Sequence, residues 1–214
     1  MREKFNGVYM ARGRLATVNS ARGFRVYNEK LFREGGREYR MWDPFRSKLA
    51  AAILNGLRRL PIQKSSDVLY LGASGGTTAS HVADMTEGMV YCVEFSKRMM
   101  HELLPVCEAK KNMIPILGDA MRPQTYMNSI GPVDFIYQDV AQRDQSGILI
   151  KNIKTFSPAD AMITIKARSI DSAVNPEKIF KEEVGKLRAQ YNVTEVINLS
   201  PYIKDHVLAS VKVK

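Results

Sequence analysis

Hydrophobic and polar residues alternate in two different ways along this chain of 214 residues. From residue 67 onward, short apolar runs of strand length take turns with longer stretches whose apolar positions recur at helical spacing. This pattern predicts an α/β fold, a mostly parallel Rossmann-like sheet closed by an antiparallel hairpin at one edge. The predicted strands are 67–72, 89–94, 113–118, 133–139, 160–166, 192–199 and 206–213, and the predicted helices are 77–85, 97–110, 122–129, 144–155 and 176–190.

The first part of the chain has short β-like runs separated by turn residues, which predict a small antiparallel sheet within residues 1–42. Asp43-Pro44 is typical of the start of a helix, so we predict a helix over 45–60 that Pro61 ends. The change of pattern predicts two domains, a small β domain at 1–42 and a larger α/β domain at 43–214.

Composition narrows the class of protein. The chain has neither an apolar run of 18 residues nor an apolar stretch of signal-peptide type at its N-terminus, so we expect a cytoplasmic protein without a membrane span. Its two cysteines, Cys92 and Cys107, lack CxxC spacing and are expected to be reduced thiols. The histidines are scattered and no zinc pattern is present, so no metal is expected.

The positive charge is concentrated at one end of the chain. Residues 1–64 carry 15 Lys and Arg against 5 Asp and Glu, a balance of +10, whereas residues 65–214 carry 17 against 17. Aromatic residues are interleaved with the basic ones in the first segment. This asymmetry favours an electrostatic surface for a polyanion such as RNA.

The first predicted strand of the α/β part runs into a glycine-rich turn. Gly72, Gly75 and Gly76 allow a tight turn and a close approach of a ligand, and Thr77 can open the next helix. The following strand ends in Glu94, 22 residues after Gly72, where an acid can accept hydrogen bonds from both hydroxyls of a ribose. The pair therefore resembles half of a nucleoside-binding site.

The turn lacks the groups that bind phosphate. A dinucleotide fingerprint requires glycine where Ser74 stands, and a P-loop requires a lysine that is absent between Gly72 and Thr78. A cofactor with a ribose but no pyrophosphate, such as S-adenosylmethionine, fits better. A nicotinamide-dependent oxidoreductase remains an alternative, because Gly72 and Glu94 match half of that site as well.

Polar residues follow the successive parallel strands at the end where such sheets bind ligands. They are Gly72, Glu94, Asp119, Asp139 and Lys166. In this arrangement Asp119 and its neighbour border an adenine, and Asp139 lies nearer the reactive end of the cofactor.

Six short motifs extend from the first helix to the end of the chain. In order they are SKLAAA at 47–52, YLGASGGTT at 70–78, GDA at 118–120, DVAQ at 139–142, IKARSID at 165–171 and KDHV at 204–207. With these motifs the chain resembles fibrillarin, the RNA 2′-O-methyltransferase family of box C/D ribonucleoproteins. The sequence lacks a Gly/Arg-rich N-terminal tail, and in this it is similar to the archaeal, fibrillarin-like form.

The resemblance implies a set of functional residues. The implied catalytic residues are Lys48, Asp139, Lys166 and His206. The implied cofactor contacts are Gly72, Thr77, Thr78, Glu94, Phe95, Asp119, Ala120, Asp139, Val140, Ala141 and Gln142.

The resemblance also implies an activity and partners. The implied reaction is the 2′-O-methylation of ribose in rRNA and tRNA with S-adenosylmethionine, at sites chosen by a box C/D guide RNA. The implied protein partners are a Nop-domain scaffold and a kink-turn-binding protein of ribosomal type. The chain carries no RRM or KH signature of its own, which agrees with target choice by base pairing. A second alternative is a non-catalytic RNA-binding subunit that keeps a degenerate methyltransferase fold.

Overall fold

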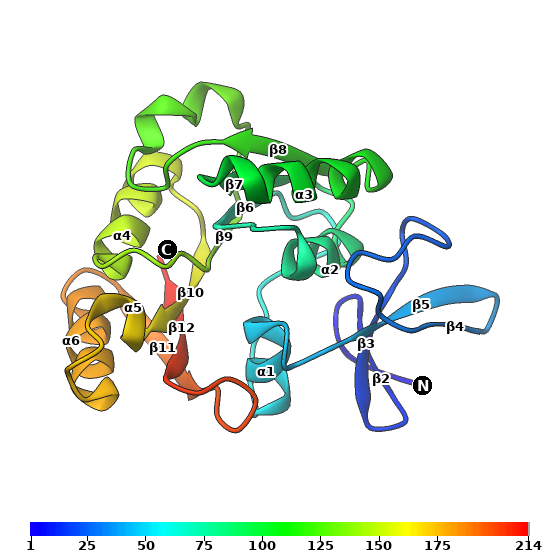
Figure 1. Ribbon diagram of the computed structural model, residues 1–214, viewed down its shortest axis with the longest axis horizontal. Coiled ribbons are helices and arrows are strands. Elements are labelled where there is room, and N and C mark those ends of the chain that lie inside the picture. Colours follow the sequence, from blue (N-terminus) through cyan, green and yellow to red (C-terminus); the bar gives the residue numbers. More distant parts are fainter. Residues whose placement is uncertain (214) are drawn as a thin grey trace.

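The computed structural model describes residues 1–213 and contains two β-sheets, connected in sequence through α1 (Lys48–Leu54) (Figure 1). The smaller sheet is antiparallel, with the strand order β1-β2-β3-β5-β4. As predicted, it is built entirely from the first 42 residues. Its strands are β1 (Arg2–Phe5), β2 (Val8–Ala11), β3 (Arg14–Val18), β4 (Leu31–Glu34) and β5 (Arg37–Trp42).

The larger sheet has the strand order β11-β12-β10-β9-β6-β7-β8. Strands β6 to β10 are parallel, and β12 runs antiparallel between β10 and β11. The predicted fold class is thereby confirmed, including the antiparallel hairpin at one edge. The strands are β6 (Val68–Leu71), β7 (Val90–Glu94), β8 (Met113–Leu117), β9 (Phe135–Gln138), β10 (Asp160–Lys166), β11 (Asn192–Asn198) and β12 (His206–Lys212).

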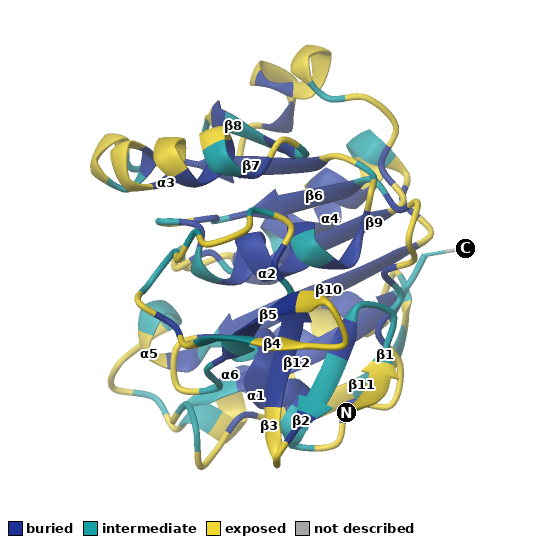
Figure 2. Ribbon diagram, turned by 90° about the vertical axis from the view of Figure 1, so that its right-hand side faces the viewer, coloured by how far each residue is buried: buried dark blue, intermediate teal, exposed yellow. Residues whose placement is uncertain are grey.

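Two hydrophobic cores lie on opposite faces of this sheet. Tyr70 and Tyr137 point into the core that also contains apolar residues of α1, α2 (Thr77–Met85) and α3 (Lys97–Ala109). Their neighbours Leu71 and Ile136 point into the other core, with α4 (Gln145–Phe156) and α6 (Pro176–Arg188). The central strands β6, β7, β9 and β10 are accordingly buried on both sides, whereas the edge strand β11 is largely exposed (Figure 2), as expected for a parallel sheet with helices on each face.

The sheet has a switch point that sets where ligands bind. From β6 the chain proceeds to β7 and β8 on one side, and later to β9 and β10 on the other. The carboxyl ends of β6 and β9 therefore meet where the chain changes direction, which is the usual ligand site of open α/β sheets.

The predicted helix over 45–60 is wrong in its bounds, because α1 spans only seven residues. The Asp43 carboxylate accepts a hydrogen bond from the Phe45 N–H and forms a separate turn, and the helix begins after Ser47, whose hydroxyl accepts from the Ala50 N–H. The chain leaves the helix at Asn55, followed by Gly56 with a φ of 100°.

The predicted helix over 122–129 is also wrong, because this segment consists of two 3₁₀ turns, Pro123–Thr125 and Met127–Ser129. Tyr126 separates the two turns, and its buried hydroxyl donates to Asn152 Oδ1 at 2.6 Å. The backbone of Tyr126 has φ −128° and ψ −4°, outside the α-helical region, so the two turns do not join into one helix. The structure adds a short helix that the pattern did not predict, α5 (Ala167–Ile170).

A buried charged cluster joins the small sheet to α2. Asp84 receives a guanidinium N–H of Arg40 at 3.0 Å and the ammonium of Lys110 at 2.5 Å, and all three side chains are fully buried. Next to it, His81 is held between the hydroxyls of Thr17 and Tyr27, each at 2.8 Å. Among residues 1–213, no helix is both long and apolar enough to cross a membrane.

Candidate active site

One carboxylate at the carboxyl end of β9 lies between two lysines. Asp139 Oδ2 is 3.0 Å from Lys48 Nζ, and Asp139 Oδ1 is 2.8 Å from Lys166 Nζ. Lys166 Nζ also donates to the Asp139 carbonyl oxygen at 2.9 Å, and Thr164 Oγ1 donates to Asp139 Oδ1 at 2.8 Å. The three charged side chains stay 13 to 21% exposed, so a substrate can reach them.

The charges of the two lysines control the ionisation of Asp139. Burial favours the neutral acid and would raise its pKa, but the charges and hydrogen bonds of Lys48 and Lys166 outweigh burial and lower the pKa below its usual value. The carboxylate is therefore ionised at neutral pH.

Lys48 reaches this cluster from the first turn of α1. Ser47 caps that turn, and its hydroxyl oxygen also accepts a hydrogen bond from Thr78 Oγ1 at 3.0 Å. Thr78 lies in the first turn of α2, so two helix starts are tied together. The predicted cofactor residue Thr78 is thus placed where it orients α1.

His206 is the first residue of β12 and pairs with Lys166 across the sheet. Its Nδ1 is 2.6 Å from the Lys204 carbonyl oxygen, which fixes Nδ1 as the protonated nitrogen. Burial, together with the charges of Lys48 and Lys166, lowers the pKa of His206 below its ordinary value despite the opposing effects of the Lys204 carbonyl and Asp139. The imidazole is therefore neutral at pH 7.

A cavity of about 360 Å³ adjoins this cluster along the carboxyl ends of the strands. Glu94 is buried at one side of it and accepts the backbone N–H of Ser74 in the glycine-rich turn and that of Ser96 at the start of α3, both at 2.7 Å. The exposed ring of Phe95 follows it. Gln142 donates from Nε2 to Asp119 at 3.1 Å, whereas its buried Oε1 has no protein partner among the described residues.

Gly72 is required where the cavity meets the charged cluster. Its φ is 81°, and a Cβ at this position would lie 2.7 Å from the carbonyl oxygen of Asp139. Only glycine allows β6 to end this close to β9.

The structure brings most of the predicted site residues together, but not all. Those that line the cavity are Gly72, Glu94, Phe95, Ala120, Asp139, Val140, Ala141, Gln142 and Lys166. Thr77, Thr78, Asp119, Lys48 and His206 are not among the lining residues, although Asp119 accepts a hydrogen bond from the lining residue Gln142. Sequence reasoning missed Ser74, Val93, Met99 and Gly118 as lining residues. Val93 and Gly118 flank predicted residues at strand ends, so the topology rule could have included them, whereas nothing in the sequence marks Met99.

A mainly parallel sheet of this strand order, with its cavity at the switch point, defines the class of Rossmann-like methyltransferase folds. Within residues 1–213, no group of three His, Cys, Asp or Glu side chains is placed to hold a metal ion.

Comparison with known proteins identifies the family. The family model described as Fibrillarin matches residues 1–214, and the chain belongs to the fibrillarin family. It is 53% identical over 211 residues to the fibrillarin-like rRNA/tRNA 2′-O-methyltransferase of Methanothermobacter thermautotrophicus, covering 97% of this chain and 94% of that one.

Two solved structures are similar over nearly the whole chain. One is the fibrillarin of Aeropyrum pernix in complex with natively bound S-adenosyl-L-methionine, with a TM-score of 0.85 and 42% identity over 92% of this chain and 88% of that one. The other is a fibrillarin/Nop5p complex, with a TM-score of 0.92 and 39% identity over 100% of both chains.

Proposed function

We propose that this protein transfers a methyl group from S-adenosylmethionine to the 2′-hydroxyl of ribose in rRNA and tRNA, at sites chosen by a box C/D guide RNA. The observation that carries the proposal is the position of Asp139, held between Lys48 and Lys166 at the mouth of the cavity. The relatives named as rRNA/tRNA 2′-O-methyltransferases support the choice of substrate.

The cavity fits the proposed cofactor. The Glu94 carboxylate provides an acceptor for ribose hydroxyls, and the buried unpartnered Oε1 of Gln142 provides an acceptor for an N–H donor such as the adenine amino group. When bound, S-adenosylmethionine supplies an electrophilic methyl group on its sulfonium sulfur. The complete set of proposed contacts is Gly72, Thr77, Thr78, Glu94, Phe95, Asp119, Ala120, Asp139, Val140, Ala141 and Gln142, of which all but Thr77, Thr78 and Asp119 line the cavity.

The charged cluster prepares the nucleophile, since a ribose hydroxyl is a weak acid. Lys166 Nζ uses two donors on Asp139, and its third donor can hold the 2′-oxygen and stabilise the negative charge that develops there. The hydroxyl proton passes to the Lys166–Asp139 pair as the oxygen bonds to the methyl carbon; the bond from that carbon to sulfur would break, with S-adenosylhomocysteine as the leaving group. Lys48 and the neutral His206 hold the adjacent phosphate or sugar. Fixing the hydroxyl in line with the methyl group contributes up to about 7–11 kcal/mol to lowering the barrier.

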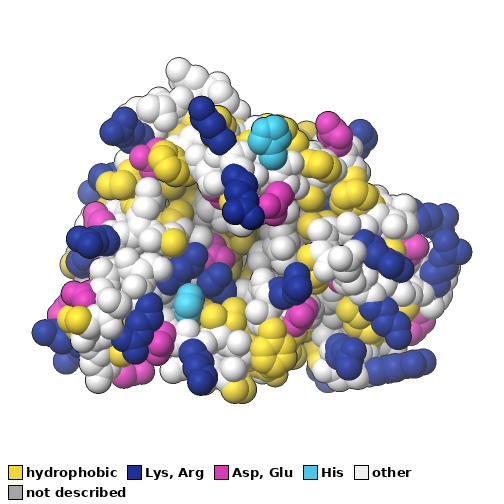
Figure 3. Space-filling view, in the orientation of Figure 1, with side chains coloured by type: hydrophobic (Ala, Val, Ile, Leu, Met, Phe, Trp, Pro, Cys, Tyr) yellow, Lys and Arg dark blue, Asp and Glu magenta, His cyan; other side chains and the backbone are white. Residues whose placement is uncertain are grey.

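The partners follow from the same assignment. The solved fibrillarin/Nop5p complex supports a Nop-domain scaffold as a partner of this chain. We include a kink-turn-binding protein of ribosomal type, the guide RNA and a cytoplasmic location in the proposal. We also propose that residues 1–42 and 43–214 act as two domains, the first of which offers RNA a basic surface. Lys and Arg side chains are spread over the part of the molecular face that the small sheet forms (Figure 3).

Reconstitution tests the proposed function most directly. The protein is combined with scaffold, kink-turn-binding protein, a guide RNA of known target and tritiated S-adenosylmethionine. We expect one labelled ribose, at the nucleotide that the guide specifies, and little methylation by the isolated protein. Site-specific methylation without the guide, or no transfer by the complete particle, would contradict the proposal.

A binding titration separates the methyltransferase from an oxidoreductase. Tyrosine and tryptophan fluorescence is followed while S-adenosylhomocysteine or NADH is added to the isolated protein. We expect saturable binding of the first and none of the second. Tighter binding of NADH would favour the oxidoreductase.

A further inference from the structure

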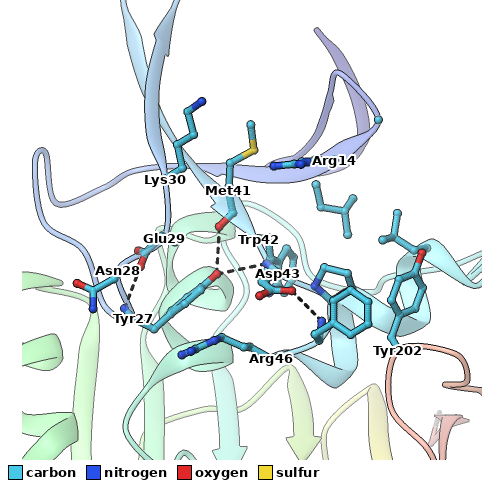
Figure 4. A pocket seen from close by; sticks show the side chains of 15 residues that line it. Arg14, Tyr27, Asn28, Glu29, Lys30, Met41, Trp42, Asp43, Arg46 and Tyr202 are labelled. Atoms are coloured by element: carbon cyan, nitrogen blue, oxygen red, sulfur yellow. Dashed lines mark hydrogen bonds between the residues drawn. The ribbon is translucent and has the colours of Figure 1, made fainter.

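A second, larger cavity of about 740 Å³ lies where the small sheet meets the start of α1. Its walls come from the small sheet, from the segment that leads into α1 and from the connection between β11 and β12 (Figure 4). The proposed reaction gives it no role, because it contains neither Asp139 nor Lys166. Its volume lies within the range of cavities that bind small molecules.

Aromatic side chains form much of its lining, namely Tyr27, Trp42, Phe45 and Tyr202. Phe45 is 67% exposed although it is large and apolar. Its ring meets that of Tyr202 edge to face, with the centroids 5.3 Å apart. An exposed aromatic ring held in this way is the kind of platform on which unpaired nucleic-acid bases stack.

Cationic side chains surround these rings. Arg14, Lys30 and Arg46 line the cavity, and the Arg46 guanidinium lies over the ring of Tyr27 with its Cζ 5.8 Å from the centroid. Figure 4 shows Arg46 alongside the ring of Tyr27. Tyr202 lies at the opposite end of this view.

Of the two acids in the lining, one is already neutralised. Glu29 Oε1 accepts from Arg40 Nε at 2.7 Å inside the protein, which leaves Asp43 against the three cations of the lining. The cavity therefore carries a net positive charge, which suits a phosphate group.

The cavity also adjoins the proposed catalytic residues through the chain itself. Phe45 precedes Lys48 by three residues, and Tyr202 precedes His206 by four. A chain of this length reaches at most about 10–14 Å. An RNA strand whose ribose contacts Lys48 and His206 therefore passes close to the Phe45–Tyr202 pair.

We propose that this cavity binds an unpaired ribonucleotide of the RNA that is being methylated, or of its guide, with the base stacked on the ring of Phe45, which Tyr202 supports edge to face, and the phosphate held by Arg46. A base engaged in a duplex is stacked on its neighbours and cannot enter, so the cavity selects a nucleotide outside the guide–target pairing. The inference rests on the proposed function, since it assumes an RNA strand at Lys48.

Crosslinking in the reconstituted particle tests the site and identifies the strand. 4-Thiouridine is placed at single unpaired positions, in one series in the substrate and in another in the guide. We expect crosslinks to the peptides that contain Tyr27, Phe45 or Tyr202 from one of the two series, and that series identifies the source. No crosslink to these peptides in either series would overturn the proposal.

Kinetics with a double variant measure what the site contributes. For Phe45→Ala with Tyr202→Ala, we expect the KM for substrate RNA to rise about 5- to 100-fold, as loss of base stacking predicts. Binding of S-adenosylhomocysteine should not change, which shows that the fold is intact. Phe45→Tyr should keep the wild-type KM, and Val196→Ala, at an exposed position on the edge strand β11, is the matched control.

The other outcomes are distinguishable. If the double variant loses the scaffold protein in a pull-down without RNA, and the crosslinks are absent, the cavity docks a protein and the proposal is wrong. If the wild-type particle transfers no methyl group, the proposed function itself fails. If it methylates normally and the double variant does so with unchanged KM, only the nucleotide site fails.

Discussion

Asp84 and Asp139 are each held between two cations, but in opposite surroundings. Asp84 lies between Arg40 and Lys110, where all three side chains are fully buried. Asp139 lies between Lys48 and Lys166, where each side chain keeps 13 to 21% of its surface exposed. In the first case the charges join the small sheet to α2. In the second case the charged side chains stay accessible to a substrate. In our proposal, solvent access rather than charge geometry separates the structural cluster at Asp84 from the reactive one at Asp139.

Asp84 also accepts more hydrogen bonds from neighbouring protein groups than Asp139 does. Asp84 accepts further hydrogen bonds from Thr17 and Ser20, so the protein itself uses its lone pairs. Asp139 receives one further side-chain hydrogen bond, from Thr164. Asp139 therefore keeps oxygen lone pairs that, in the proposed reaction, can accept a hydrogen bond from the ribose hydroxyl.

The largest expected effect is on the reaction. Lys166→Ala should lower kcat of the reconstituted particle by about 10²- to 10⁴-fold, because it removes the group that holds the 2′-oxygen. Its free energy of unfolding should fall by only about 1–2 kcal/mol, since Asp139 keeps Lys48 and Thr164 as partners. Single-turnover methylation and urea unfolding measure the two effects. Lys178→Ala, in an exposed ion pair, is the control, and turnover of Lys166→Ala near the wild-type value would contradict the assignment.

Removing the buried carboxylate of Asp84 should lower stability strongly and leave cofactor binding unchanged. Asp84→Ala leaves the buried ammonium of Lys110 with only the Ser20 hydroxyl, and Arg40 with Glu29 as its one remaining carboxylate, and should lower the free energy of unfolding by about 3–5 kcal/mol. Under conditions in which the variant is folded, binding of S-adenosylhomocysteine should be unchanged. Glu87→Gln, in the exposed pair with Lys64, should change stability by less than about 1 kcal/mol. An equal loss of unfolding free energy in both variants would contradict the distinction between buried and exposed ion pairs.

Acidification should act first through the buried region. Burial, together with the charges of Arg40 and Lys110, holds the pKa of His81 well below its ordinary value of 6.5. Below pH 6.5 the unfolded chain therefore binds a proton that the folded protein does not, so stability falls with falling pH by up to about 1.4 kcal/mol per pH unit. The pKa of His206 is lowered less. Its contribution to the pH dependence of stability therefore has the same sign and is smaller.

Unfolding midpoints in urea between pH 5 and 7.5 measure this slope. His81→Gln should remove most of it and His206→Gln a smaller part. NMR of the imidazole carbons should find His81 neutral throughout this range. A protonated His81 at pH 6 would contradict the sign.

The smallest effect should come from the helix caps. Ser47→Ala and Ser96→Ala each remove a serine whose hydroxyl accepts from the N–H three residues later, at 3.3 Å in both cases. Each should cost about 1 kcal/mol of stability. Only Ser47→Ala should also lower kcat, by a few-fold, because Lys48 begins the helix that Ser47 caps. Equal activity of the two variants would show that the cap does not position Lys48.

The sequence predicted the larger sheet well because buried parallel strands are short, continuous apolar runs that little else in a chain resembles. The helix over 45–60 was overestimated for a physical reason. Leu57 and Leu60 do enter the core, as their spacing indicated, but they reach it from irregular chain after Gly56. Burial of a periodic leucine does not require helical backbone.

The candidate site was predictable as far as it depends on strand ends. Glu94, Asp139 and Lys166 end or follow parallel strands, and topology alone brings them together. The role of Thr78 was not predictable in this way, because its hydrogen bond is to Ser47, which lies 31 positions earlier in the chain at the start of another helix. The inward turn of Tyr126 likewise depends on Asn152, which lies on another element.

The contact between Gly72 and the Asp139 carbonyl bears on how this enzyme family can be re-engineered. Main-chain hydrogen bonds tie Gly72 to Val93 at 2.9 Å and Asp139 to Leu71 at 2.8 Å. The spacing between the ends of β6 and β9 is therefore a property of the backbone and does not depend on any rotamer. Changing the side chains around the cavity or around Asp139 can alter what binds there, whereas the two strand ends keep the same separation as long as position 72 has no side chain.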